Sequence, residues 1–490
     1  MNQKNKIERV VPSPLVSFVP LAVLVLFLSV TIYEFGDNAL AGGSQVCLLV
    51  SSAVCVALSM WRYRVKWKSF ESAIAHNVKR VTEAFYILLI IGALSGAWMM
   101  CGVVPTLIYY GLQLIHPTFF LVSCCVICAL VSVMTGSSWT TIATLGVALI
   151  GIGQAQGFHE GWVAGAIISG AYFGDKLSPL SDTTVLASST IGVKLFEHIR
   201  YMLLTTLPAL IIALLVYLLV GLSMGSGHHV GIEEYKLALS DKFNLSLWSL
   251  IVPALTAYMI YRRLPSLVTL FLSTLLACLY AMVAQPDVLL ELSGASAPAI
   301  MSSFRGVMQM VFGETNLQMG SESLNDLVST RGMSGMMDTI WLILCAMCFG
   351  GVMEASGFLL GIAKVFMKFV RNTFSLVSST VACGLFMNLV TADQYISIIL
   401  TGNMFKTTYE HEGYDARLLS RSTEDAVTVT SPLVPWNTCG MTQAAILGVS
   451  TWTYLPYCVF NYVCPMMSVA LATIGYRILR KKPAAESIEE

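Results

Sequence analysis

The stretch GAYFGDKLSPLSDTT, residues 170–184, decides the fold because it sets two carboxylates and a proline within an otherwise apolar region. Pro179 lacks a backbone N–H and clashes with the preceding helical turn, and it disfavours helical geometry at Ser178. A helix therefore breaks here and frees backbone carbonyls. Such irregular backbone survives inside a membrane only when it is buried in protein or lines a cavity. Asp175 and Asp182 are expected at such a place.

The composition indicates a membrane protein. The chain has 490 residues, of which 56% are hydrophobic and 11% charged, and its formal net charge is zero. Soluble domains carry about 25% charged residues, so this chain is suited to an apolar solvent. No basic face suggests nucleic acid. No zinc motif, Walker loop or serine elbow is found, and the loops are too short for a catalytic domain, so neither enzymatic activity nor a cofactor is expected.

The apolar runs predict an all-α polytopic fold. Eight runs are long enough for spans of about 20 residues: 15–33, 44–61, 83–113, 201–222, 245–262, 265–284, 337–363 and 453–476. Prolines and polar residues interrupt two further stretches, 162–193 and 418–450, which we interpret as broken helices.

Two more stretches, 118–156 and 374–406, are apolar with polar centres at residues 135–138 and 391–394. We interpret them as re-entrant hairpins, because each arm has only about 15 residues, fewer than a span needs. The alternative is two short spans in each stretch.

The positive residues predict the orientation, since loops rich in Lys and Arg face the cytoplasm. These loops hold Arg62, Arg64, Lys66, Lys68, Lys79 and Arg80; Lys194 and Arg200; Arg262 and Arg263; Lys364, Lys368 and Arg371; and Arg477, Arg480, Lys481 and Lys482. The alternation holds if both termini are cytoplasmic and each hairpin returns to its starting side. About ten full spans and two hairpins in a bacterial inner membrane are therefore expected.

The chain also repeats itself. Residues 83–89 align with residues 338–344, and the same offset pairs Gly96 with Gly351 and Gly102 with Gly357. Similar offsets pair the hairpin centres and the two Ser-Pro-Leu sequences. In the predicted topology the copies start on opposite sides, as in the inverted repeats of secondary transporters. The predicted organisation is a cytoplasmic segment 1–14, a first repeat 15–222, a periplasmic linker 223–244, a second repeat 245–476 and a cytoplasmic tail 477–490.

Ionisable residues inside a membrane are costly and are therefore functional candidates. The candidates for binding a cation or proton are Asp175, Ser178, Asp182 and Thr183 in the first half, and Asp393, Asn437 and Thr438 in the second. Asn437 and Thr438 occupy roughly the place of Asp182 and Thr183. Asp175 and Asp182 are the predicted Na⁺ ligands, because carboxylates, hydroxyls and freed carbonyls are hard oxygen ligands.

Several residues are secondary candidates, namely Glu424, Asp425, Glu354, Ser137 and Ser431. Glu424 and Asp425 could belong to the site or form a cytoplasmic entrance balanced by Arg421. Asp393 at a hairpin tip has no evident structural role. All seven histidines fall in loops or at span ends, so carboxylates are expected to carry any proton through the core. A buried carboxylate that holds either a proton or Na⁺ would exchange the two.

The 170–184 stretch closely resembles the signature of the NhaC-type sodium/proton antiporters, and shorter blocks at 92–98, 105–111 and 391–394 agree. The resemblance implies inverted repeats, two hairpins and two broken helices. It also implies that the residues named above line a cation path. The family includes exchangers of organic acids, such as malate against lactate.

The leading hypothesis is exchange of Na⁺ for H⁺. The alternative is a Na⁺- or H⁺-coupled carrier of a small organic anion or amino acid, favoured by hydroxyls at residues 137–141 and by helix N-termini that attract anions. The expected partners are Na⁺, with Li⁺ as a further cation, H⁺ and the lipid bilayer. A small organic anion and a homodimer are left open.

Overall fold

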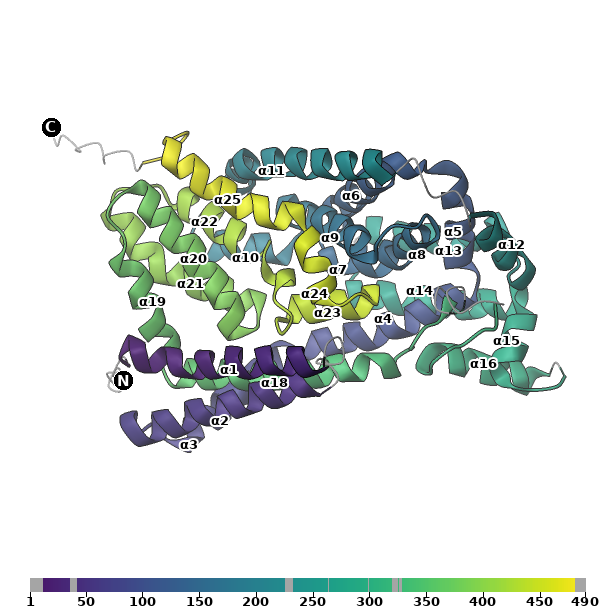
Figure 1. Cartoon of the computed structure of the whole chain (residues 1–490), viewed down its shortest axis with the longest axis horizontal. Coiled ribbons are helices and arrows are strands. Elements are labelled where there is room, and N and C mark those ends of the chain that lie inside the picture. Colours follow the sequence, from purple (N-terminus) through teal and green to yellow (C-terminus); the bar gives the residue numbers. More distant parts are fainter. Residues whose placement is uncertain are drawn as a thin grey trace.

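The structure, a computed structural model, describes residues 12–35, 42–224, 232–262, 264–297, 299–319, 325 and 328–480. Within these ranges it contains helices and two isolated β-bridges. Nine described helices are long and apolar enough to cross a membrane, or up to eleven if each of two bent pairs is one span. Most helices run along the long axis of the molecule (Figure 1). The predicted all-α polytopic class is confirmed.

Most of the segments predicted at 1–14 and 477–490, and the centre of the linker 223–244, lie outside the described residues. The helices of the first half are α1 (Pro14–Phe35), α2 (Gly43–Tyr63), α3 (Trp67–Arg80), α4 (Thr82–Met100), α5 (Val103–Leu114), α6 (Pro117–Thr135), α7 (Ser138–Thr141), α8 (Val147–Ala155), α9 (Glu160–Leu177), α10 (Asp182–Ile191) and α11 (Leu195–Met224). A π-helical turn, Ile142–Gly146, joins α7 to α8.

The helices of the second half are α12 (Ile232–Lys242), α13 (Ile251–Tyr261), α14 (Ser266–Ala284), α15 (Pro286–Ser293), α16 (Ile300–Phe312), α18 (Met337–Ala355), α19 (Phe358–Lys368), α20 (Thr373–Thr391), α21 (Gln394–His411), α22 (Ala416–Ala426), α23 (Thr438–Leu447), α24 (Thr451–Tyr454) and α25 (Val459–Ile474). Short 3₁₀ turns precede α13 and α18, and another, Ser431–Leu433, lies between α22 and α23.

Two predicted spans are wrong in extent, because a glycine ends a helix within each. The run 83–113 divides into α4 and α5 at Gly102, and the run 337–363 divides into α18 and α19 at Gly357. Both glycines are left-handed, with φ of 85° and 74°. L-residues with side chains rarely adopt this conformation, whereas glycine adopts it freely. The aligned glycines thus have the same structural role in both halves.

The two halves begin with antiparallel helices. An added Cβ on Gly92 in α4 would meet Gly332 and Met336, just before α18 begins. One on Gly351, near the end of α18, would meet Ile74 in α3. The α3–α4 segment therefore runs against α18 with opposite direction, as inverted copies require. The division into domains at the predicted boundaries stays a prediction.

α3 separates positive residues that the predicted cytoplasmic loop groups together. Lys79 and Arg80 lie at the far end of this 14-residue helix, which packs against α18. At 1.5 Å per residue, Arg80 lies about 20 Å along the helix from Trp67. α2 ends, α19 meets α20 and α25 ends at the end of the molecule where α1 begins (Figure 1). Arg62, Arg371 and Arg477 lie in or beside these helix ends in the chain.

Both polar-centred stretches form helical hairpins. α6 meets α7 at Gly136, which is left-handed, and α20 meets α21 at Ala392, which is left-handed as well. The arms contain 18 or 19 residues. The expectation of arms near 15 residues is therefore wrong, and arm length does not separate a hairpin from two spans. The buried tips, with Ser138 and Asp393 at 1% and 3% exposure, favour hairpins that end inside the protein.

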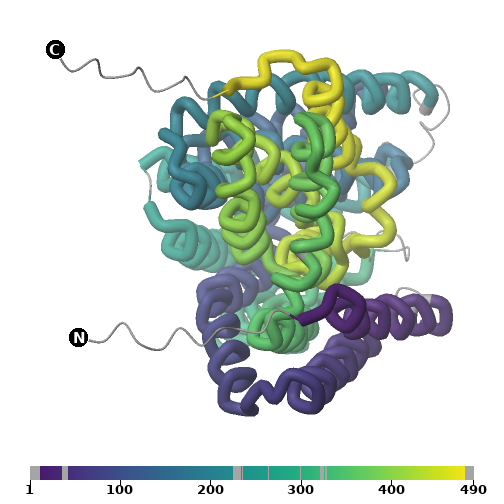
Figure 2. Tube along the Cα trace, turned by 90° about the vertical axis from the view of Figure 1, so that its left-hand side faces the viewer, coloured from purple at the N-terminus to yellow at the C-terminus, as the bar shows by residue number. Residues whose placement is uncertain are grey.

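Both Ser-Pro-Leu sequences interrupt helices, as Pro179 and Pro432 predict. α9 ends at Leu177 and α10 begins at Asp182. α22 ends at Ala426, and extended backbone at Val434 and Asn437 precedes α23. The first helices, α1 to α3, lie on the side of the molecule away from α11, as both views show (Figures 1 and 2). The hairpins and broken helices lie between these sides.

Close helix contacts generate a stability prediction at Gly96. A Cβ added there would overlap the carbonyl oxygen of Met310 on α16. Overpacking of this kind costs about 1–3 kcal/mol. We expect Gly96→Ala to lower the melting temperature of the purified protein in a fluorescence-detected thermal shift assay. Ser95→Ala, one residue away, is the control, and equal melting temperatures for both variants would contradict the packing.

Candidate functional site

The two hairpin tips and the two helix breaks meet in the interior and form one polar centre. The first tip contacts the first break, because Ser138 donates to Asp175. The first break contacts the second hairpin, because Tyr395 donates to Asp182. The second hairpin contacts the second break, because the backbone N–H of Thr438 donates to the carbonyl of Ala392 at 2.9 Å. Both halves of the chain therefore build this centre.

Asp175 is the buried carboxylate of the centre, at 5% exposure in the last turn of α9. Ser138 Oγ donates to its Oδ2 at 2.7 Å, and Ser181 Oγ donates to its Oδ1 at 2.6 Å. Thr183 Oγ1 lies 2.9 Å from Ser181 Oγ. Two serine hydroxyls and a threonine hydroxyl thus surround one carboxylate, and all are oxygen groups that suit a small hard cation.

The freed carbonyls at this break are only partly available. Thr184 Oγ1 lies 3.3 Å from the carbonyl of Asp175 and 3.1 Å from that of Lys176. Ser178 Oγ donates to the carbonyl of Val133 on α6 at 2.8 Å and so fixes the break to the hairpin. The Ser178 hydroxyl thus makes a positioning contact, while its backbone N–H donates to the carbonyl of Asp175 at 3.3 Å.

Asp182 differs from the expectation that both acids are buried, because its side chain is exposed. Its Oδ1 accepts from the N–H of Thr183 at 2.9 Å, and its Oδ2 accepts from the hydroxyl of Tyr395 at 2.6 Å. A carboxylate at the first turn of α10 is also favoured by the helix dipole. Asp182 therefore joins the first break to the second hairpin at the rim of the centre.

Asp393 has a structural role that sequence reasoning missed. It is the N-cap of α21, and its Oδ1 accepts from the N–H of Ile396 at 2.9 Å. Ser137 has the same role at the other tip, where it caps α7. Both residues follow a threonine, Thr135 or Thr391, whose hydroxyl bonds the backbone across the tip. The N-cap position favours both Ser and Asp. One tip can therefore carry a neutral serine and the other an aspartate.

Asn437 and Thr438 lie beside this second tip. Asn437 caps α23 by accepting from the N–H of Cys439 at 3.0 Å. Thr438 Oγ1 lies 3.4 Å from Asp393 Oδ2. Since Ser181 caps α10, Asn437 matches Ser181 rather than Asp182. The predicted pairing is therefore shifted by one residue.

Two secondary candidates make no hydrogen bond or ion pair with Asp175 in the described part of the chain. Ser431, at the second break, donates from Oγ to the carbonyl of Thr428 within its own turn. Glu354 is half-buried one residue before α18 ends.

Glu424 and Asp425 are fully buried in this conformation, so whether they belong to the site or to a cytoplasmic entrance stays a prediction. Asp425 forms an ion pair with Lys176 of α9, and Thr205 Oγ1 on α11 donates to the same carboxylate at 3.1 Å. Arg421 is also fully buried, and its Nε lies 4.0 Å from Asp425 Oδ2.

His198 lies at a span end as expected, in the first turn of α11, but it is fully buried there. Its Nδ1 lies 2.8 Å from Ser420 Oγ. Its charged neighbours Glu197 and Arg200 gave no sign of this burial.

Other members of the centre lack a signal in the sequence. Gln443 donates to the hydroxyl of Tyr172 at 3.2 Å, and Cys439 Sγ lies 2.7 Å from Gln394 Oε1. Ser181 was the member most open to prediction, because a serine before Asp-Thr-Thr is typical of an N-cap.

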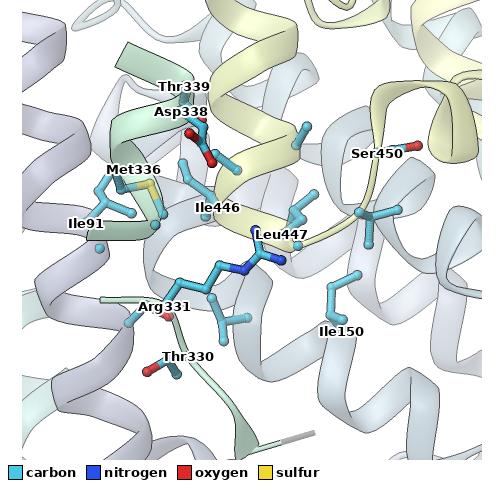
Figure 3. Close-up of a pocket in the computed structure, with 18 of the residues that line it drawn as sticks. Ile91, Ile150, Thr330, Arg331, Met336, Asp338, Thr339, Ile446, Leu447 and Ser450 are labelled. Carbon is cyan, nitrogen blue, oxygen red and sulfur yellow. The ribbon is translucent and has the colours of Figure 1, made fainter. Parts of the chain in front are cut away.

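A vestibule of about 700 Å³ lies beside the second break, where Pro435 and Met441 line it. Glu160 and Asp338, at the starts of α9 and α18, line it as well. Arg331 extends its guanidinium into this space beside Leu447 (Figure 3). The described residues that line the vestibule include none from α1 or α22.

The chemistry of the centre suits an alkali cation rather than a transition metal. Carboxylate and hydroxyl oxygens suit hard cations, whereas zinc and copper sites use imidazole and thiolate. No cluster of three or more His, Cys, Asp or Glu that could hold a metal occurs within the described ranges. Asp175, Ser138, Ser181 and Thr183 are therefore the residues that could hold Na⁺.

Helical hairpins and broken helices that meet at a buried carboxylate define a membrane transporter of the secondary type. The chain belongs to the Na⁺/H⁺ antiporter family, whose model matches residues 170–476.

Relatives are similar over most of their length. The malate-2H⁺/Na⁺-lactate antiporter of Bacillus subtilis is 37% identical over 88% of this chain and 89% of its own. The Na⁺/H⁺ antiporter NhaC of Alkalihalophilus pseudofirmus is 34% identical over 90% of this chain and 91% of its own. The arginine/ornithine antiporter ArcD of Halobacterium salinarum is 32% identical over 97% of this chain and 94% of its own.

The buried ion pair yields a second prediction. Removing one partner of a buried pair costs about 3–5 kcal/mol because the other charge is left unpaired. Lys176→Met should therefore lower the melting temperature strongly, and Lys176→Met combined with Asp425→Leu should recover most of the loss. A double variant no more stable than the single variant would contradict the pairing.

Proposed function

We propose that the protein is a secondary antiporter that exchanges Na⁺ for H⁺ across the bacterial inner membrane by alternating access. The observation that carries the proposal is the buried carboxylate of Asp175 at a helix break, with the hydroxyls of Ser138 and Ser181 bonded to it. Membership of the Na⁺/H⁺ antiporter family supports Na⁺ and H⁺ as the two substrates. Li⁺ fits the same oxygen ligands.

The exchange follows from the burial of one charge. An unpaired ionised carboxylate in an apolar environment is strongly unfavourable, so Asp175 must hold a proton or a cation in each state of the cycle. A proton and Na⁺ both neutralise it, and they exclude each other. In the Na⁺-bound state the hydroxyls of Ser138 and Ser181 turn their oxygens to the ion. With a proton bound, one of the two hydroxyls accepts from the carboxyl O–H and the other donates to the remaining carboxyl oxygen.

Asp182, Asp393, Asn437 and Thr438 belong to the proposed cation path through their contacts across the centre. Asp182 is the exposed carboxylate at the rim and acts as the first ligand that an arriving cation meets. Asp393 and Asn437 hold the second hairpin and the second break in place by capping their helices.

Alternating access requires the centre to open to one side at a time. The vestibule beside Pro435 supports access from one end, and the buried Lys176–Asp425 pair closes the other. The positive-inside rule makes the vestibule periplasmic, because Arg62, Arg371 and Arg477 lie at the opposite end. We therefore propose that this conformation is outward-facing, with both termini cytoplasmic. Movement of the hairpin-bearing bundle by an elevator-like or rocking step would reverse it.

The transport test uses everted membrane vesicles with an interior pH dye, from a host without its own antiporters. Addition of Na⁺ should dequench the dye in the wild type. Asp175→Asn should abolish this response, because an amide exchanges no proton at neutral pH. Asp241→Asn, an exposed carboxylate change on α12, is the control and should keep the wild-type response. Full activity of Asp175→Asn would refute the proposed site.

A second candidate function is coupled exchange of a small organic acid or amino acid. Two observations favour it: the malate-2H⁺/Na⁺-lactate antiporter is among the similar relatives, and Arg331 extends a guanidinium into a vestibule large enough for such an anion. A guanidinium binds carboxylates in bidentate geometry.

Uptake of radiolabelled malate or lactate into proteoliposomes separates the two functions. The Na⁺/H⁺ antiporter predicts dye responses to Na⁺ without organic acid and no labelled uptake. Labelled uptake that Arg331→Gln abolishes would instead favour the organic-acid exchanger.

A further inference from the structure

Glu424 is a buried ionisable group that the proposed exchange at Asp175 does not use. It lies two helical turns into α22, its side chain is fully buried, and neither carboxylate oxygen has a hydrogen-bond partner within the described residues. Thr428 lies two residues beyond the end of α22, and its hydroxyl also lacks such a bond in the described part of the chain.

The positive charges nearby are directed at Asp425 instead. Lys176 forms its ion pair with Asp425, and the Arg421 guanidinium lies over the ring of Tyr201 with its Nε 4.0 Å from Asp425. No salt bridge joins either cation to Glu424 across the described ranges. A carboxylate in this position is strongly unfavourable when ionised, and a bound proton removes the cost.

We propose that Glu424 is a second proton-binding site of the antiporter, separate from the cation site at Asp175 and coupled to it through charge. Consecutive residues of α9 connect the two sites. Asp175 forms the cation site, and Lys176 donates to Asp425, the residue next to Glu424 on α22. The negative charge of an ionised Asp175 favours the proton on Glu424, and Na⁺ bound at Asp175 neutralises that charge and so favours release of the proton. Na⁺ and this proton therefore need no shared ligand.

Buried polar groups that lack hydrogen-bond partners in the described structure lie between Glu424 and the start of α22 and on the neighbouring α11. α22 begins at Ala416, and Arg417 at the surface precedes Glu424 by seven residues, about 10 Å along the helix. Arg421 lies between them, and all three of its guanidinium nitrogens lack hydrogen bonds among the described residues. His198 Nε2 lacks one as well. Such unsatisfied buried groups mark sites that bound water can bridge.

The helices packed against α22 limit which other charges act on Glu424. α20 and α25 carry no charged side chain, and α10 carries only the exposed Asp182. The titratable or charged groups that face this region are Asp175, Lys176, His198, Tyr201, Tyr409, Arg421, Asp425 and Cys464. The other charged residues of α21, Lys406, Glu410 and His411, are half-buried or exposed.

The experiment, which rests on the proposed Na⁺/H⁺ exchange, measures ²²Na⁺ binding and Na⁺-induced proton release on the same purified protein. In weakly buffered detergent solution, Glu424→Gln should bind Na⁺ within about threefold of the wild-type affinity, yet release fewer protons per bound Na⁺. Glu424→Asp, which keeps a carboxyl, should restore part of the release. Glu410→Gln, an exposed change on α21, is the control and should match the wild type.

Unchanged proton release per bound Na⁺ in Glu424→Gln would overturn the second site. Loss of Na⁺ binding in folded Glu424→Gln would overturn it too, because Glu424 would then belong to the cation site. Two other results would contradict the proposed Na⁺/H⁺ exchange itself. The wild type would release no protons when Na⁺ is added, or Asp175→Asn would bind Na⁺ with wild-type affinity.

Discussion

The structure depends on the cost of holding a carboxylate away from water. Asp175 lies where a helix breaks, and the protein meets that cost with two serine hydroxyls from different elements. The first hydroxyl requires the α6–α7 hairpin tip to reach the break, and the second requires α10 to begin with Ser181 as its N-cap. The hairpin, the break and the contact between them therefore all stabilise the buried carboxylate of Asp175.

The two halves use the same backbone devices with different side chains. A left-handed residue followed by an N-cap forms each tip, with Ser137 in one half and Asp393 in the other. The first half adds the buried acid Asp175, while the second adds Asn437 and Thr438. The two halves thus resemble each other in backbone conformation at the tips, while their side-chain chemistry differs.

The sequence predicted the breaks and the tips because proline, glycine and hydropathy act locally. It misplaced the ends of two spans, because Gly102 and Gly357 end helices that composition alone would continue. It did not predict the Lys176–Asp425 pair or the burial of His198, because these depend on packing between residues far apart in the chain. The role of Asp393 as an N-cap was readable from its position before α21, but its charge suggested function first.

The most direct test of the central claim is Na⁺-induced infrared difference spectroscopy of the purified protein, in the C=O stretching region of protonated carboxyl groups. If Asp175 exchanges its proton for Na⁺, addition of Na⁺ removes a protonated-carboxyl band in the wild type, and Asp175→Asn lacks that change. The same band loss in Asp175→Asn, or no Na⁺-dependent change in the wild type, would contradict the account.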